Sequence, residues 1–112
     1  MKRIMTLVAA VVLVVAVMGG EVKINKERCT VIKDGKEYPL YGKWKIVDNF
    51  EDIKIKIVDN FEDVDIKIVD AFEDRCGKVK IVDNFEDVKV KIVDNFEDIK
   101  VKIVDNFEGV KK

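Results

Sequence analysis

Residues 53–63 read Ile-Lys-Ile-Lys-Ile-Val-Asp-Asn-Phe-Glu-Asp, and the repetition of this unit decides the fold. The hexad Val-Asp-Asn-Phe-Glu-Asp, or a near copy, occurs six times, beginning at Val47, Val58, Val69, Val82, Val93 and Val104. Ile and Lys alternate ahead of the hexad, which is typical of a β-strand because successive side chains point to opposite faces. The repeats therefore predict an all-β protein.

Each hexad also predicts a turn, because Asp and Asn tolerate a left-handed backbone. We predict two-residue hairpin turns at Asp48, Asn49, Asp59, Asn60, Asp70, Ala71, Asp83, Asn84, Asp94, Asn95, Asp105 and Asn106. In the resulting antiparallel register, Lys56 faces Asp63 and Ile55 faces Val64, and both are favourable cross-strand pairs. Hexads begin 11 residues apart, except for a 13-residue step from Val69 to Val82; the two extra residues keep every side chain on its face.

The expected architecture is an antiparallel β-meander of about 7–8 strands with 11-residue repeats, curled into a small barrel or roll to hide its apolar face. The alternative is a β-solenoid with two repeats per coil. Parallel copies would stack Lys over Lys and Asp over Asp, and like charges in register are destabilising. The meander is preferred for that reason.

The remaining residues predict two further segments. Residues 1–20 combine Lys2-Arg3, an apolar run and Gly19-Gly20, which is the pattern of a signal peptide. An uncleaved N-terminal anchor is the alternative. Residues 21–41 predict a β-hairpin around Asp34-Gly35, a preferred turn pair, and residues 42–112 form the six-copy repeat domain. We expect an exported protein that is periplasmic, secreted or part of the cell envelope.

The two cysteines, Cys29 and Cys76, lie 47 residues apart. Export would expose them to oxidising conditions, so a disulfide between them is one expectation. Unpaired thiols and an intermolecular bridge remain open, because spacing alone does not prove pairing. Two cysteines without any histidine do not make a zinc site, and we expect no metal and no cofactor.

The residue inventory argues against an enzyme. The chain has no His, Ser or Gln, and its carboxylates recur in every repeat, whereas a catalytic site needs one asymmetric constellation in a pocket. Neither a phosphate-binding glycine loop nor a nucleophile elbow is present in the sequence.

The tandem Val-Asp-x-Phe-x-Asp units behind Gly-Lys-Trp-Lys at residues 42–45 resemble a group of short, exported bacterial proteins of uncharacterised function. The resemblance covers residues 42–112. It implies a bacterial source, and it supplies neither an activity nor functional residues.

We therefore expect a non-catalytic protein with a structural or binding role in the cell envelope. A small membrane β-barrel, a fibre-forming subunit and a calcium-binding repeat protein are the alternatives. The expected partner is a second copy or an envelope component. The finely mixed charge argues against nucleic acid, and contact with a membrane is expected only through an uncleaved leader. The phenylalanines are expected to pack against valines across the turns rather than to grip a glycan or a partner. The lysine rows are expected to be solvated or salt-paired.

Overall fold

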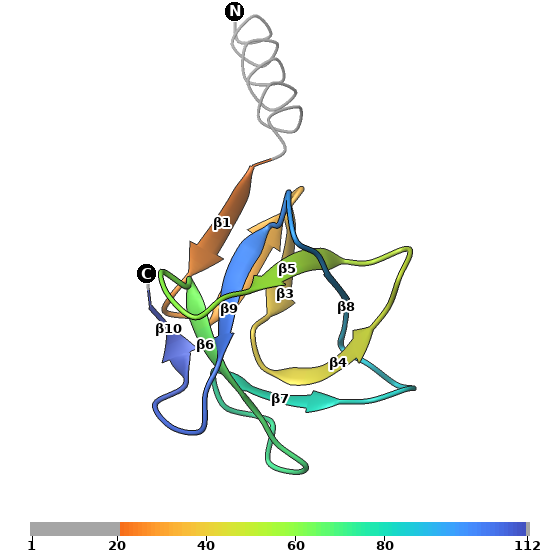
Figure 1. Cartoon of the computed structure of the whole chain (residues 1–112). Helices are drawn as coiled ribbons and strands as arrows, with labels where there is room; N and C mark the ends of the chain where they lie inside the picture. The colour runs from red at the N-terminus through yellow and green to blue at the C-terminus, as the bar shows by residue number, and fades with distance from the viewer. Residues whose placement is uncertain (1–20, 112) are drawn as a thin grey trace, which may run out of the picture.

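The computed structural model of the chain describes residues 21–111, so the predicted signal peptide at residues 1–20 lies outside the described part. Every regular element between residues 21 and 111 is a β-strand, which confirms the all-β prediction (Figure 1). That stretch contains no helix long and apolar enough to cross a membrane. The strands are β1 Val22–Asn25, β2 Thr30–Lys33, β3 Lys36–Pro39, β4 Gly42–Ile46, β5 Ile53–Ile57, β6 Val64–Ile68, β7 Lys78–Ile81, β8 Val88–Ile92, β9 Ile99–Ile103 and β10 Gly109–Val110.

Strands β1, β2 and β3 form a separate antiparallel sheet. Its β2–β3 turn is Asp34-Gly35, and both residues have positive φ, 53° and 81°, as a type I′ turn requires. Residues 21–41 thus hold three strands where the sequence indicated a two-stranded hairpin, because β1 adds to the free edge of β2 with Val22 opposite Lys33.

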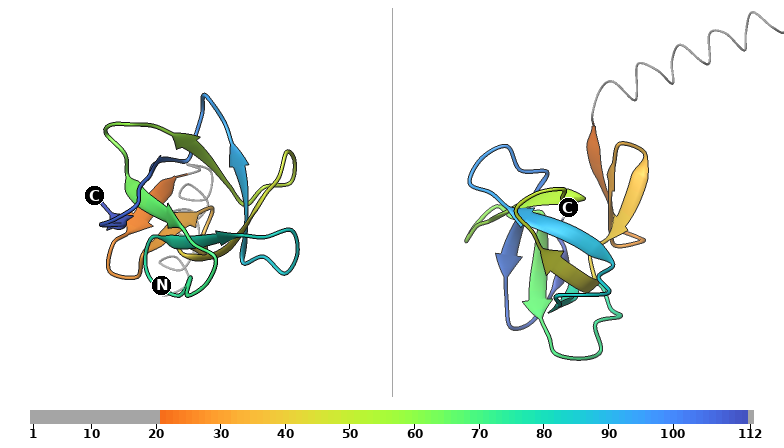
Figure 2. Two further views of the ribbon diagram at one scale, coloured as in Figure 1. Left: turned by 60° about the horizontal axis from the view of Figure 1, so that its bottom comes forward. Right: turned by 90° about the vertical axis from the view of Figure 1, so that its right-hand side faces the viewer.

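Strands β4 to β9 close into a six-stranded parallel barrel in the order β6-β7-β4-β8-β5-β9, with β9 returning to β6 (Figure 2). Curling into a small barrel is confirmed, but the antiparallel meander is wrong. The described residues contain ten strands rather than seven or eight. No two consecutive repeats form a hairpin: β4 pairs with β7 and β8, not with β5, and β6 and β7, which are neighbours, pair in parallel.

The barrel consists of two interleaved coils, which we call the first coil (β4, β5 and β6) and the second coil (β7, β8 and β9). Each strand of one coil lies between two strands of the other. The offset is regular, since Gly42 pairs with Val79, Ile53 with Val90 and Val64 with Val101. The solenoid alternative anticipated this parallel stacking of like residues. It missed the interleaving, which lets the sheet close and leaves no open edge in the ring.

Aspartates at the ends of four hexads hold the coils together. The backbone N–H of Asp52 donates to the carbonyl of Lys89 at 2.8 Å, and the Asp52 carboxylate accepts the backbone N–H of Lys89 at 2.8 Å. The same two-way contact, which we call the aspartate clamp, joins Asp63 to Lys100, Asp87 to Lys43 and Asp98 to Lys54. The sequence-based register had instead placed these carboxylates opposite lysine side chains across a hairpin.

The barrel interior is filled by alternate residues of its strands, which are the first and third residues of five strands and the second residue, Val79, of β7. Ile53 and Ile55 of β5 are 0% and 3% exposed, and Trp44 of β4 is equally buried. Val31 and Leu40 belong to the same apolar cluster, so the β1–β3 sheet closes one end of the barrel. The other end, where the strands finish, is not covered by that sheet.

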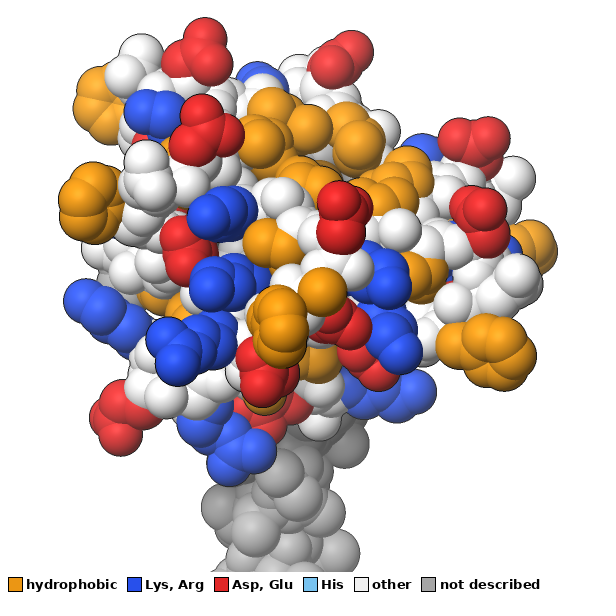
Figure 3. All heavy atoms as spheres, turned by 90° about the horizontal axis from the view of Figure 1, so that it is seen from below, with side chains coloured by type: hydrophobic (Ala, Val, Ile, Leu, Met, Phe, Trp, Pro, Cys, Tyr) orange, Lys and Arg blue, Asp and Glu red, His pale blue; other side chains and the backbone are white. Residues whose placement is uncertain are grey.

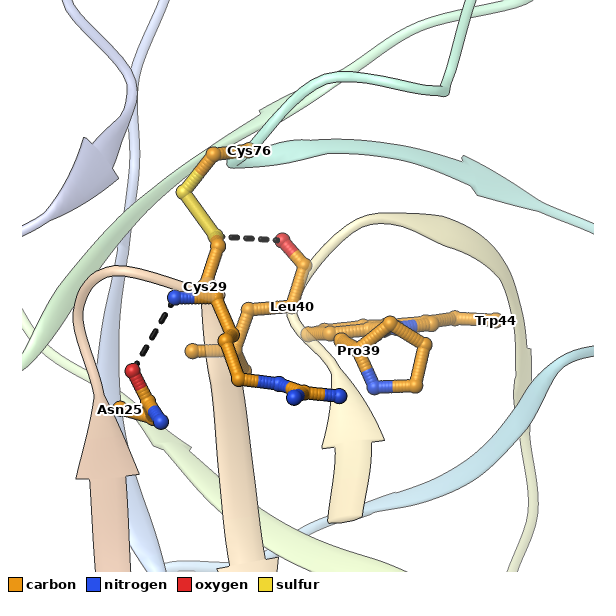
Figure 4. The surroundings of a disulfide bond; sticks show 7 residues. Asn25, Cys29, Pro39, Leu40, Trp44 and Cys76 are labelled. Atoms are coloured by element: carbon orange, nitrogen blue, oxygen red, sulfur yellow. Dashed lines mark hydrogen bonds between the residues drawn. A yellow bond between two sulfur atoms is a disulfide. The ribbon is translucent and has the colours of Figure 1, made fainter.

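A disulfide fastens the β1–β3 sheet to the link between the two coils (Figure 4). Cys29 and Cys76 are bonded with their Cα atoms 5.6 Å apart. Leu40 lies beside the bond, donating its N–H to the Cys29 carbonyl and accepting the N–H of Gly77, both at 2.9 Å. Closing a loop of this length stabilises the fold by about 4 kcal/mol when the lost entropy of the unfolded chain is counted.

The chain end docks back onto β6. Gly109 and Val110 of β10 pair with Asp65 and Val64. Asp65 is 4% exposed, and the Lys111 ammonium lies 3.1 Å from its carboxylate. Gly77 lies directly under this contact: a Cβ atom there would be 2.7 Å from the Gly109 nitrogen and 2.9 Å from the Asp65 carbonyl oxygen.

The Gly77→Ala substitution is therefore expected to destabilise the protein more than Gly35→Ala. Both glycines have positive φ, and each alanine costs about 1–2 kcal/mol for the left-handed backbone. Only Gly77 is crowded, which adds about 1–3 kcal/mol of overpacking. Equal shifts of the two urea midpoints would contradict the docking of β10 on β6.

The aspartate clamp can be tested with Asp52→Ala against Asp48→Ala, an exposed residue of the same hexad. Loss of the clamp leaves the Lys89 N–H without its acceptor, so the free energy of unfolding is expected to fall by about 1–3 kcal/mol. Asp48→Ala should change it by about 0.5 kcal/mol or less. If chemical unfolding curves of the two variants coincide, the carboxylate has no role in joining the coils.

Candidate functional site

The six hexads form exposed loops that carry the phenylalanines outward. Four loops leave one barrel strand and enter the next strand of the same coil, passing over the strand between them, whereas the loop after β6 leads to the second coil and the loop after β9 leads to β10. The predicted turn residues all lie in these loops and are exposed. The phenylalanine side chains are 82–91% exposed, and the loops point away from the barrel in several directions (Figure 2): Phe50, Phe61, Phe72, Phe85, Phe96 and Phe107.

The backbone of each loop is left-handed at phenylalanine, not at the preceding Asp or Asn. All six phenylalanines have φ of 60° or 61°. This conformation is uncommon for any residue with a side chain and is an outlier for a bulky one. The expected packing of valine on phenylalanine is wrong, because Val58 and Phe61 belong to a connection between strands that do not pair with each other. The sequence carries no local signal for this conformation.

Hydrogen bonds hold both ends of a loop in place. The N–H of Val58 donates to the Val101 carbonyl at 2.9 Å, which extends the ladder one residue beyond β5. At the far end of the same loop, the Asp63 clamp grips Lys100 at 2.8–2.9 Å. The four residues between these anchors therefore present the phenyl group from a fixed base, which lowers the conformational entropy lost on binding.

Neither core packing nor backbone geometry accounts for phenylalanine at this position. The phenyl ring is hydrated in all six copies, and glycine would adopt the same φ without strain. Strained residues persist where the surrounding structure holds them, and they gather at functional sites. These six phenylalanines with their loops, which we call the phenylalanine loops, are the candidate binding site.

The uncovered end of the barrel is a second apolar feature, which we call the apolar mouth. It is a cavity of about 270 Å³ whose rim is the last residue of each barrel strand. Figure 3 shows hydrophobic side chains gathered on the face seen from below, with charged side chains around them. The rim residues are 41–47% exposed: Ile46, Ile57, Ile68, Ile81, Ile92 and Ile103.

Four acidic side chains of the loops form hydrogen bonds that hold the two coils together. Within residues 21–111, no three or more Cys, Asp or Glu side chains converge in a way that could hold a metal ion. The last aspartates of four hexads are occupied in clamps instead.

Burial raises the pKa of Tyr38 above its usual value, and the nearby Asp52 carboxylate adds to the rise, so this phenol stays protonated at neutral pH. Cys29 and Cys76 are bonded to each other and lie outside the loops.

Replacing one phenylalanine tests whether the fold needs it. Phe61→Gly removes about 1–2 kcal/mol of left-handed strain and adds about 0.5–1 kcal/mol of unfolded-chain entropy. The free energy of unfolding is therefore expected to stay level or rise by up to about 1.5 kcal/mol, as measured by chemical denaturation. Phe61→Ala retains the strain and should stay close to the wild type. A loss of more than about 2 kcal/mol in either variant would assign the phenyl group to the core.

One comparison with known proteins identifies the family of the chain. Residues 37–111 match a family model described as the 7(1) septoil knot domain, and this range runs from within β3 past the end of β10. No curated protein matches the chain. The matched region includes both coils. The chain belongs to the septoil knot domain family.

Proposed function

We propose that the protein is an exported, non-catalytic binding protein of the cell envelope that contacts its partner through the phenylalanine loops. One observation carries the proposal: six phenylalanines, each 82–91% exposed, are held with left-handed backbones in loops that all begin with a hydrogen-bonded valine N–H and in four cases end in an aspartate clamp. In the isolated molecule, both the exposure of the phenyl groups to water and the left-handed backbone are unfavourable. A partner that covers the phenyl groups removes the cost of their exposure, because burying one phenylalanine side chain contributes about 1.5–3 kcal/mol to the free energy of binding.

The distribution of the loops favours a partner with repeated features. The loops leave the barrel in different directions, so no single flat surface can touch all six (Figure 2). A long or repetitive partner, such as an envelope polymer, can engage several loops in turn. Linked contacts raise the overall affinity by about 10²–10⁴ without any new kind of contact.

The chemistry of the loops supports binding rather than catalysis. Their carboxylates are either exposed at the tips or engaged with backbone N–H groups, as in the Asp52 clamp. The raised pKa of Tyr38 keeps that phenol from acting as a base near neutral pH. A turnover activity in the purified protein would count against the proposal.

Replacing all six phenylalanines with alanine tests the proposal. The readout is retention of the purified protein on cell-envelope material from the organism that produces it. We expect retention to fall at least tenfold, because each loop loses its buried contact, while the circular dichroism spectrum stays that of the wild type.

The matched control changes the residue before phenylalanine in five of the six loops, since the sixth already has alanine there, Ala71. It carries alanine at Asn49, Asn60, Asn84, Asn95 and Asn106, all of which are exposed. Retention of this variant is expected to match the wild type. If the six-phenylalanine variant is retained as well as this control, the loops do not carry the binding.

A further inference from the structure

The parallel stacking of the coils brings lysines side by side on the outer wall of the barrel. Apart from Asp65, lysines occupy the outward positions between the buried residues of each strand, and in register they lie next to lysines of the neighbouring strands. The lysine pairs between neighbouring strands are Lys43 with Lys80, Lys45 with Lys89, Lys54 with Lys91, Lys56 with Lys100 and Lys67 with Lys78.

These pairs join into a belt that runs around the whole barrel. Two residues along a strand lead from each pair to the next, so Lys78 continues to Lys80 on β7, and Lys43 continues to Lys45 on β4. The belt closes through Lys102, whose partner on β6 is Asp65. Asp65 is the single non-lysine member, and the Lys111 ammonium lies 3.1 Å from its carboxylate and neutralises that charge.

The belt lysines are almost free of ion pairs. Within residues 21–111, Lys54 alone among them lies within 4 Å of a carboxylate, that of Glu51 at 3.9 Å. The acidic residues are instead in the loops, where four of them bind backbone N–H groups. Charges that alternate finely along the chain are therefore separated in space, with a basic wall and acidic loops. Figure 3 shows lysine and arginine side chains in groups on both sides of the visible face.

Like charges in register are destabilising. A bound anion would remove this repulsion. Neighbouring strands lie about 4.8 Å apart, and alternate residues along a strand about 6.7 Å apart, so a ligand must carry charges that recur over a few ångströms. Lysine ammonium groups act as point charges toward phosphate.

We propose that this lysine belt binds a flexible polymer of sugar or polyol phosphate diesters that wraps the barrel wall. The belt is a continuous positive track, and a linear polymer can follow it from pair to pair. Single-stranded nucleic acid fits less well. Stacking of its bases on the phenylalanines would bring its phosphates against the loop carboxylates beside them, such as Asp59 and Glu62. This proposal stands on the lysine register and does not depend on what the phenylalanine loops bind.

The test measures binding of poly(glycerol phosphate) to the protein, expressed as the full chain and purified from cells. With about five phosphate contacts, raising the salt concentration from 50 to 200 mM is expected to weaken binding about 100-fold, with log Kd linear in log salt. A variant carrying Lys56→Gln, Lys91→Gln and Lys100→Gln is expected to bind at least tenfold more weakly at 50 mM salt and to show a shallower salt slope.

The control removes three lysines from the β1–β3 part of the chain: Lys23→Gln, Lys26→Gln and Lys36→Gln. It has the same net charge as the belt variant and should bind within about twofold of the wild type, because phosphate contacts are local. Equal weakening of both variants would show attraction by net charge alone and overturn the proposal. A single-stranded oligonucleotide that binds more tightly than poly(glycerol phosphate) would overturn the choice of polymer.

A second readout needs no ligand. Relief of lysine–lysine repulsion should leave the thermal midpoint of the belt variant equal to or above that of the wild type at low salt, with a smaller rise on adding salt. A lower midpoint would mean that the belt lysines support the fold, and the belt would no longer stand as a binding surface.

Discussion

Backbone hydrogen bonding between the two coils is the constraint on which the rest of this structure depends. Strands β4 and β5 find partners only in β7, β8 and β9, so a strand of one coil satisfies its polar backbone by lying between strands of the other. The ladder continues beyond the strands through the hexad valines, as in the 2.9 Å bond from Val47 to Val90. The aspartate clamps complete it at the strand entrances. Once this pairing is set, barrel closure, the outward loops and the lysine belt all follow.

The same constraint sorts the charges. Parallel strands in register put lysine beside lysine, and the loops then contain most of the carboxylates of the repeat domain. The repulsion on the wall is small beside the gain from closing the ring, in which every strand has a neighbour on both sides. The net charge of the chain is only −1, yet the barrel wall is positively charged and the loops are negatively charged. Asp65 is the exception on the wall, and its partner is the lysine at the chain end.

Several features could be predicted from local sequence. Ile53 and Ile55 are buried on either side of the outward Lys54, as their alternation indicates. Val79 is fully buried as well, because the two extra residues before the second coil are an even number. The Asp34-Gly35 turn follows from the identity of its two residues. All of these depend on the residue itself or on its near neighbours.

The pairing direction could not be predicted in that way. A two-residue period specifies which face of a strand is buried and says nothing about which strand lies next to it. The preference for lysine opposite aspartate favoured hairpins, but Asp63 uses its charge on a backbone N–H of the other coil. True knots are also essentially absent among proteins, so the sequence gives no reason to expect the knot that the family description names. The left-handed phenylalanines were missed because no residue type near them requires that conformation.

Interleaving has a consequence for how the protein is made. As the ribosome releases the chain, residues 42–68 emerge with strands that have no neighbours, and they must wait for residues 78–103 before a single barrel rung can form. Neither half is a folding unit, so a chain cut between Asp74 and Gly77 would give two fragments that each lack the other's hydrogen-bonding groups. The barrel can close only after its last strand, β9, has left the ribosome. Folding of the barrel therefore follows the synthesis of all six strands and does not proceed strand by strand during it.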